Sequence, residues 1–249
     1  VYLITVKNTG TLTDTIDLTI QNPNATWSAS LDVSQVTLAT QASKDVNLTV
    51  TSPGSAPPNT NNTVKVIGTS RGNTKKSANV STLTTIIPAI VLIDDESSTD
   101  ETYYKAALDA NGYKYDYVAG PTQSTGWAGF LMQYKIVIWF VSGSSNTLTS
   151  IDQQNIATFL DSGGKLLVCG EDIGFNIGTS TFYKSYLHAN YIADDTNIAN
   201  IDGVAGDPIG NGFTNIPIAG SYPSEIGLYD SYASKIFTYT GSTKIAALK

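Results

Sequence analysis

Two groups of carboxylates in this chain directly follow apolar stretches. In open α/β sheets, ligands bind at the carboxyl ends of such strands. They end the segments 88–96 and 165–172, and the five residues are Asp94, Asp95, Glu96, Glu171 and Asp172. Clustered carboxylates repel one another unless a cation, an Arg or a shared proton lies between them. Because hard oxygen ligands suit Ca²⁺ or Mg²⁺, these residues define a candidate calcium or magnesium site. The alternative, which we favour, is structural: Asp94 or Asp172 caps a helix or accepts loop N–H groups, and the others are solvated.

The segment Val91–Glu96 resembles the acidic opening of response-regulator receiver domains. That resemblance implies a phosphorylatable Asp at the end of the third strand. The corresponding segment here, 138–142, reads Ile-Trp-Phe-Val-Ser and contains no carboxylate. The sequence therefore argues against a phosphoacceptor.

Cys169 and His188 are the only cysteine and the only histidine. The segment 134–172 resembles the class I glutamine amidotransferase-like fold, whose catalytic members pair a His with a nucleophilic Cys on a strand-to-helix elbow. Here the expected elbow lies nearer Glu171 than Cys169, and His188 closely follows Cys169 on an expected helix. We therefore expect Cys169 to be a small buried hydrophobe. A Ser-His-Asp triad would also need His188, and no G-x-S-x-G elbow is present.

Aromatic residues in polar segments give a second kind of candidate site. They are Trp127, Tyr222, Tyr229 and Tyr232. Aromatics with a polar handle favour interfaces, including those with carbohydrate. The alternative is that they fill cores beneath long loops, and both interpretations stay open.

Composition excludes several classes of protein. The chain has 249 residues, a net charge of −7, 14% charged residues and 41% hydrophobic residues, which suits two domains with real cores. It is neither a basic nucleic-acid binder nor a charge-dense disordered tail. No apolar run approaches the roughly 20 residues that span a bilayer, so we expect no membrane insertion. A single cysteine excludes an intrachain disulfide.

The polar composition favours an extracellular location. Lys, Arg and Glu are few, while Ser, Thr, Asn, Tyr and Gly are abundant. N-x-[ST] sequons, which are glycosylation acceptors, occur only in the first third of the chain, at Asn24, Asn47, Asn61 and Asn79. The alternative is an unmodified polar surface.

Residues 1–86 are expected to form a two-sheet β-sandwich because short alternating stretches are separated by turn-rich segments. The predicted strands are 2–7, 17–20, 27–31, 45–50, 64–67 and 78–81. In the strand 45–50 the apolar side chains share one face, which leaves Asn47 and Thr49 to face solvent.

Residues 89–249 are expected to form a doubly wound, mainly parallel α/β domain, since strands alternate with helices. The predicted strands are 90–93, 115–118, 136–141, 165–169 and 191–193. The first predicted helix begins with a capping box at 98–101 and ends at 111–112; the second has Thr149 as its N-cap, and a third covers 181–188. The tail from Asp194 is expected to be long loops with short strands.

Two resemblances agree with this division. Residues 1–86, with "VKNTGTLTDTIDLTI" and "WSASLDVSQVTLATQASKDVNLTVTSP", resemble an Ig-like module of bacterial and archaeal surface proteins. Residues 89–249, with "SGGKLLVCGEDIGFNI" and "FYKSYLHANYIADD", resemble the amidotransferase-like α/β module that accompanies secreted peptidases and other large exported proteins. The second resemblance implies an accessory region and supplies no catalytic residues.

Both ends of the chain are strand-like and unterminated, so we expect a piece of a longer polypeptide. The leading hypothesis is a non-catalytic, secreted or cell-surface region that serves spacing, adhesion or assembly, with no cofactor. Its expected partners are other domains of the same polypeptide, neighbouring copies or cell-surface glycans. The alternatives are the accessory portion of a secreted peptidase, or a component of an extracellular filament or S-layer completed by β-strand exchange.

Overall fold

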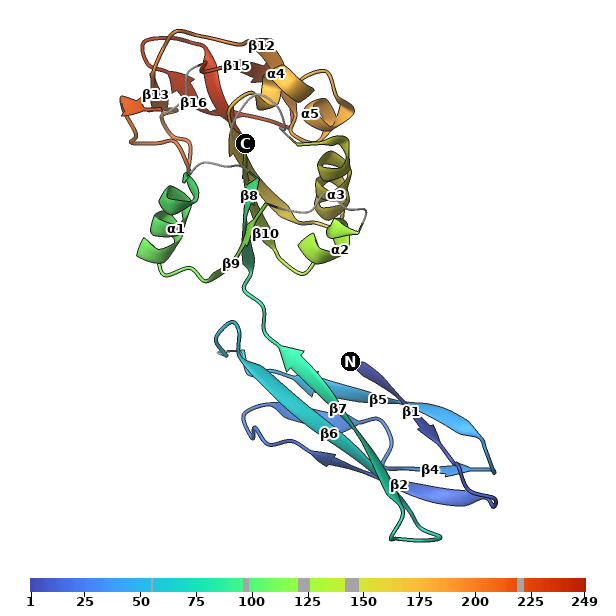
Figure 1. Cartoon of the computed structure of the whole chain (residues 1–249). Helices are drawn as coiled ribbons and strands as arrows, with labels where there is room; N and C mark the ends of the chain where they lie inside the picture. The colour runs from blue at the N-terminus through green and yellow to red at the C-terminus, as the bar shows by residue number, and fades with distance from the viewer. Residues whose placement is uncertain (55, 96–98, 121–125, 142–147, 219–221) are drawn as a thin grey trace. The chain divides into compact units, whose positions relative to one another are not determined.

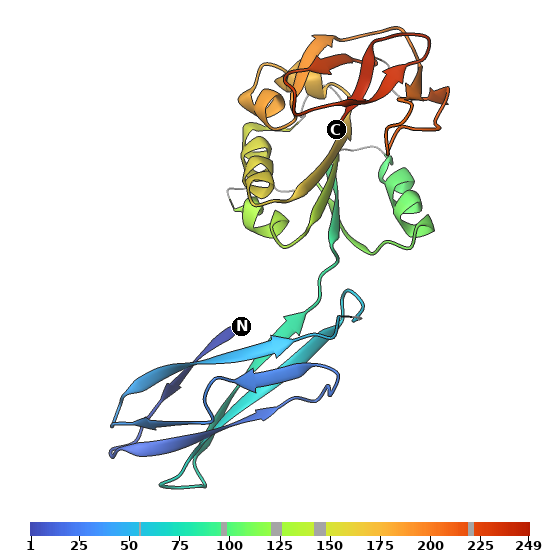
Figure 2. The same ribbon diagram turned by 180° about the vertical axis from the view of Figure 1, so that it is seen from behind.

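The computed structural model describes the chain except for residues 55, 96–98, 121–125, 142–147 and 219–221. The chain divides into two compact units, Val1–Ile87 and Pro88–Lys249 (Figures 1 and 2). The first is built of strands alone, and the second combines helices with two sheets. The predicted fold class, an all-β unit followed by an α/β unit, is confirmed.

The first unit consists of two antiparallel sheets. Their strands are β1 (Tyr2–Lys7), β2 (Asp14–Gln21), β3 (Ser28–Leu31), β4 (Gln35–Leu38), β5 (Ser43–Thr51), β6 (Asn61–Ser70) and β7 (Ser77–Thr85). One sheet has the order β1-β5-β3 and the other β4-β2-β6-β7. Side chains of both sheets meet in the core, where Val46 and Leu48 of β5 are fully buried. Asn47 and Thr49 are exposed, as the alternation predicted.

The second unit has a four-stranded parallel sheet. Its strands are β8 (Ile90–Asp95), β9 (Tyr115–Ala119), β10 (Ile136–Val141) and β11 (Lys165–Gly170), in the order β11-β10-β8-β9. The helices α1 (Glu101–Ala110), α2 (Trp127–Leu131) and α3 (Ser150–Asp161) connect them. Figure 1 shows α1 on one side of this sheet and α2 and α3 on the other.

Each face of the parallel sheet has its own core, which explains the unbroken apolar run in β8. On one face Ile90 and Leu92 lie in the cluster that packs against Tyr104 and Leu108 of α1. The rings of Tyr104 and Phe140 stack 4.4 Å apart there. On the other face Val91 and Ile93 lie in a cluster that contains Trp139 together with Ile156 and Phe159 of α3.

The C-terminal part of this unit differs from the sequence prediction. Beyond α4 (Ile173–Ile177) and α5 (Thr181–Ser185), the chain forms a six-stranded antiparallel sheet rather than mostly loops. The strands are β12 (Ala189–Ala193), β13 (Asn200–Gly203), β14 (Ile216–Pro217), β15 (Glu225–Leu228), β16 (Lys235–Tyr239) and β17 (Ile245–Leu248). Their order is β12-β15-β17-β16-β13-β14. They are short and interrupted by turns, so their periodicity is too brief to read from the sequence.

The predicted helix ends are partly right. Thr149 is the N-cap of α3 and forms a capping box with Asp152. α1 begins after Asp100, whose backbone is already helical, and the capping box predicted at 98–101 depends on Ser98 as its N-cap. Ser98 lies outside the described residues. No helix of the described part is long and apolar enough to cross a membrane.

Candidate functional site

The first carboxylate group lies at the carboxyl end of β8, where Asp94 and Asp95 accept hydrogen bonds from the two neighbouring strands. Tyr117 of β9 donates its hydroxyl to Asp94 Oδ2 at 2.6 Å. Trp139 of β10 donates its indole N–H to Asp95 Oδ2 at 3.2 Å. Asp94 is buried, with 5% of its surface exposed. Both carboxylates therefore connect strands of the parallel sheet.

Asp95 has a perturbed acidity. Burial raises its pKa to about 6, and the hydrogen bond from Trp139 opposes part of this shift. The charges of Asp152 and Asp94 raise the pKa further, because a second negative charge nearby disfavours ionisation. Asp152 is buried and occupies the first turn of α3. Asp95 therefore changes its protonation state at mildly acidic pH.

The second carboxylate group follows β11. Asp172 lies in the left-handed region, with φ 61°, so the sharp turn from β11 into α4 occurs beside Glu171, where the elbow was expected. Burial raises the pKa of Asp172, and the charges of Glu171 and Asp194 add to that shift. Asp194 was absent from the sequence-based candidates, since it lies in the segment predicted as loops.

The four predicted cation ligands with described positions divide into these two neighbourhoods. The carboxylates that act on Asp95 are Asp152 and Asp94, whereas those that act on Asp172 are Glu171 and Asp194. Glu96 lies outside the described residues. Among the residues with described positions, no three His, Cys, Asp or Glu side chains gather in a way that could hold a metal ion. The calcium or magnesium site stays a prediction.

Cys169 is exposed, so the expectation that it is a buried hydrophobe is wrong. It lies on β11, an edge strand. The side chains that pack into a core from this strand, Leu166 and Val168, are on the face opposite Cys169. Its neighbour on the same face, Leu167, is 51% exposed. The face of β11 that carries Cys169 is thus open to solvent over the described residues.

His188 does not lie on a helix, because α5 ends at Ser185; instead it has a left-handed backbone with φ 51°. Its Nδ1 lies 2.8 Å from Asp230 Oδ2, and its ring lies 5.4 Å from that of Tyr232. The hydrogen bond with His188 holds the pKa of Asp230 below its ordinary value. Asp230 is far along the chain from His188 and had no sequence signal.

The predicted glycan acceptors all lie in the first unit. Asn47, Asn61 and Asn79 are exposed and Asn24 is half-buried. Asn24 Oδ1 accepts hydrogen bonds from its own sequon Thr26, whereas Asn47 Nδ2 donates to Asp32 at 3.0 Å. Glycosylation itself stays a prediction.

The four loop aromatics separate into two kinds. Tyr222, Tyr229 and Tyr232 are exposed, and Tyr232 is the most open, with 84% of its surface accessible. Trp127 instead packs against Phe130 and Trp139, so it belongs to the core. The tyrosines are available for contacts with a partner.

A groove that the sequence did not predict lies between the two sheets of the first unit. It has a volume of about 810 Å³. Its apolar lining comes from β1, β2, β6 and β7 and includes Ile4, Val6, Ile16, Leu18, Val66 and Val80. Residues of an edge strand line this groove: they face the sandwich interior but stay exposed. Which strand lies at the edge depends on the strand order, so the groove could not be predicted from the sequence.

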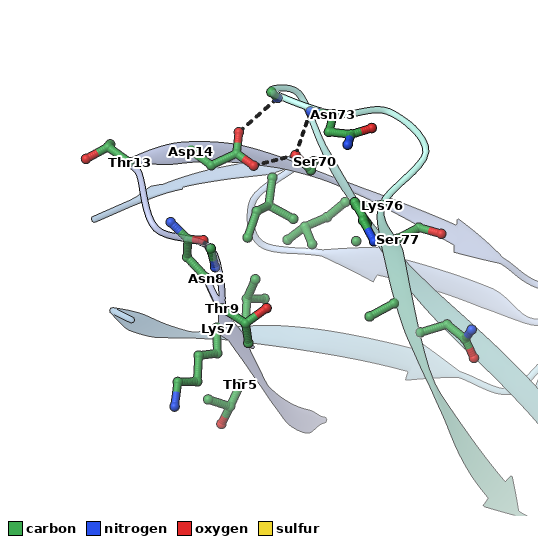
Figure 3. Close-up of a pocket in the computed structure, with 18 of the residues that line it drawn as sticks. Thr5, Lys7, Asn8, Thr9, Thr13, Asp14, Ser70, Asn73, Lys76 and Ser77 are labelled. Carbon is green, nitrogen blue, oxygen red and sulfur yellow. Dashed lines mark hydrogen bonds between the residues drawn. The ribbon is translucent and has the colours of Figure 1, made fainter. Parts of the chain in front are cut away.

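Polar contacts fix one end of this groove (Figure 3). The Asp14 carboxylate accepts hydrogen bonds from the Ser70 hydroxyl and from the Gly72 N–H, the latter at 3.0 Å. These bonds hold the pKa of Asp14 below its ordinary value, and the bond from Ser70 has the larger effect. Asn8 is buried and donates to the Leu38 carbonyl oxygen at 3.0 Å. These bonds tie the turns at this end of the groove to the strands beside them.

The second unit is by its sheets an α/β structure, and comparison with solved structures gives a partial likeness. The chain is similar to the crystal structure of a protein from Thermoplasma acidophilum described as a GMP synthase subunit, with a TM-score of 0.41 and 11% sequence identity. The match covers 61% of this chain and 72% of that chain. A scan against models of protein families gives no match, and neither does a search of curated proteins.

Proposed function

We propose that this chain is a non-catalytic region of a larger secreted or cell-surface protein, where an Ig-like sandwich and an amidotransferase-like module serve spacing, adhesion or assembly. The observation that carries the proposal is that Asp94 and Asp95 are engaged in hydrogen bonds between strands. Both accept hydrogen bonds from aromatic side chains, Tyr117 and Trp139, of adjacent strands. Hydrogen bonds of this kind link β8 to β9 and to β10, which gives the acidic strand end a structural role.

Surface chemistry supports an extracellular location and contacts with other molecules. Three sequon asparagines and three loop tyrosines are exposed. Exposed tyrosines combine apolar area with a hydrogen-bonding hydroxyl, which suits contacts with glycans or with neighbouring protein domains. The net charge of −7 gives no attraction for nucleic acid.

The location is tested by treating intact source cells with a non-penetrating protease. An antibody raised against this chain then follows its loss from the cells and its presence in the medium. We expect the chain to be cleaved on intact cells or to be found in the medium. Protection until the cells are lysed would contradict the proposal.

The non-catalytic role is tested with the purified chain on panels of peptide, amide and ester substrates. We expect no turnover. Hydrolysis that disappears in Cys169→Ala or His188→Ala, the residues that a Cys–His dyad would use, would overturn this part of the proposal.

A further inference from the structure

β7 is an edge strand with an unusual lack of protection. It pairs with β6 over nine consecutive residue pairs, from Asn61↔Thr85 to Thr69↔Ser77, without a bulge. Its other edge pairs with no strand of the described chain. Soluble proteins usually protect such edges with charged residues, prolines or bulges. β7 has the sequence SANVSTLTT and has none of these.

The groove opens along the same edge. Val80 lies opposite Val66 and faces the sandwich interior, yet 42% of its surface is exposed, whereas Val66 is 3% exposed. Ala78, opposite Gly68, is also exposed. Towards the far end of β7, the Tyr2 hydroxyl donates to the Leu83 carbonyl oxygen at 2.8 Å and so joins β1 to β7. The sandwich is thus closed at one end of this edge and open at the Ala78 end.

We propose that β7 pairs antiparallel with β7 of a second copy of this chain, about a two-fold axis at Ser81. This pairing rests on the proposed role in assembly and deepens it. Ser81 is the middle residue of β7, so this register places the nine residues of one strand opposite those of the other. The Leu83 carbonyl oxygen already accepts a hydrogen bond from the Tyr2 hydroxyl and takes part in the pairing through its second lone pair. An interface of this kind is isologous, because the same surface is used twice.

The strand is suited to pairing with itself. In this register Val80 lies opposite Thr82 of the second copy, and Ser81 lies opposite its counterpart. β-Branched and hydroxyl pairs of this kind stabilise antiparallel sheets, whereas like charges directly opposite destabilise them. No charged residue lies in β7, so self-pairing opposes no like charges. In the same register the exposed Ala78 of each copy lies opposite Thr84 of the other.

A cysteine at the two-fold axis tests the pairing directly. Residues opposite each other in an antiparallel pair have Cα atoms about 4.5–5.5 Å apart, within the range of a disulfide. In a Cys169→Ser background, which removes the exposed native thiol, we expect Ser81→Cys to form a cross-linked dimer with oxidised glutathione. Thr49→Cys, exposed on the inner strand β5, is the matched control and should stay monomeric.

A charge exchange gives a second readout that requires no cysteine. We expect Ser81→Lys alone and Ser81→Asp alone to weaken the dimer about fivefold in sedimentation velocity, because each opposes two like charges at the axis. An equimolar mixture should restore it as a heterodimer. Thr49→Lys should leave the dimer unchanged.

A chain that stays monomeric up to about 1 mM and gives no Ser81→Cys cross-link would overturn the pairing. Equal cross-linking by Thr49→Cys would overturn it as well. So would a dimer whose affinity is unchanged by Ser81→Lys and Ser81→Asp. None of these results affects protease accessibility on intact cells. The proposed location can therefore stand or fail separately.

Discussion

The Trp139 indole N–H donates to the Asp95 carboxylate across 3.2 Å, and Trp139 is itself fully buried. The hydrogen bond favours the ionised carboxylate, but burial outweighs it, and the pKa of Asp95 rises to about 6. The folded chain thus binds a proton at Asp95 more tightly than the unfolded chain, whose carboxyl has an ordinary value of 3.8. Stability from this group is present below pH 3.8 and is lost as the pH rises through 6.

Asp95→Asn should therefore stabilise the chain at pH 7 by about 1 kcal/mol, a value reduced because the carboxylate is partly exposed and screened. The difference should shrink as the pH falls and disappear at about pH 3, where the Asp95 carboxyl is neutral in both the folded and the unfolded chain. Urea unfolding at the two pH values measures it. In the wild type, the NMR signal of the Trp139 indole proton should titrate with a midpoint near pH 6.

Asp116→Asn is the control for this titration. Asp116 lies in the same sheet and accepts a hydrogen bond from Tyr134 at 2.8 Å. The Trp139 signal should still titrate in this variant. A Trp139 signal that does not respond between pH 4 and 8 in the wild type would show that Asp95 has no raised pKa.

Tyr117→Phe tests the second hydrogen bond at the end of β8. The change removes the hydroxyl that donates to the buried Asp94 carboxylate. The ring remains beneath the Lys105 ammonium, which lies 3.4 Å from its centroid. Loss of a hydrogen bond to a charged, buried acceptor should destabilise the chain by about 1.5–3 kcal/mol in urea unfolding.

Tyr103→Phe is the matched control, because Tyr103 of α1 is 75% exposed. It should change stability by less than about 0.5 kcal/mol. Equal effects of the two variants would mean that the Asp94 hydrogen bond adds nothing beyond loss of a tyrosine hydroxyl.

Local patterns predicted most strands up to β11, though not β4, because their causes are local. Apolar and polar residues alternate in Val46–Val50 because only one face of that strand is covered. The apolar run Ile90–Ile93 is unbroken because both faces of its strand are covered. Thr149 caps α3 through Asp152, only three residues away. Each of these features is decided within one turn or one strand.

Features that depend on strand order could not be predicted in the same way. Trp139 reaches Asp95 across 44 residues of sequence, and Asp230 reaches His188 across 42. Cys169 lies in an apolar strand, but β11 is at the sheet edge, so one of its faces is open. The groove likewise exists because β7 is the last strand of its sheet. Neighbours of this kind are fixed by the whole topology.

Gly164→Ala tests the packing at the start of β11. A Cβ at Gly164 would lie 2.2 Å from the ring of Phe159, which is 1% exposed in the core. Since Phe159 is held by its neighbours, the overlap should destabilise the chain by about 1–3 kcal/mol in thermal or urea unfolding.

Gly129→Ala provides the comparison, because nothing lies within 4 Å of its Cβ position in α2. Alanine favours helix by up to about 1 kcal/mol over glycine, so this variant should be neutral or more stable. A tolerated Gly164→Ala would show that Phe159 can move, contrary to the close packing at this site.

The contact between His188 and Asp230 should appear as a pH-dependent coupling in a double-mutant cycle. The folded pKa of Asp230 is lowered, chiefly by the hydrogen bond with His188, so its contribution is present above its ordinary value of 3.8 and lost as the pH falls through the folded value. Asp230→Ala and His188→Asn are suitable variants, since alanine removes the acceptor at 230 and asparagine tolerates the left-handed backbone at 188.

At pH 7 the double variant should lose less stability than the sum of the two single variants, because either change already removes the contact. Well below pH 3.8 the coupling should vanish, as protonated Asp230 no longer attracts the imidazole. Hydrogen exchange of the Tyr229 amide, which donates to the His188 carbonyl oxygen at 2.9 Å, follows the same region locally. Additive losses at pH 7 would mean that the two side chains do not interact in solution.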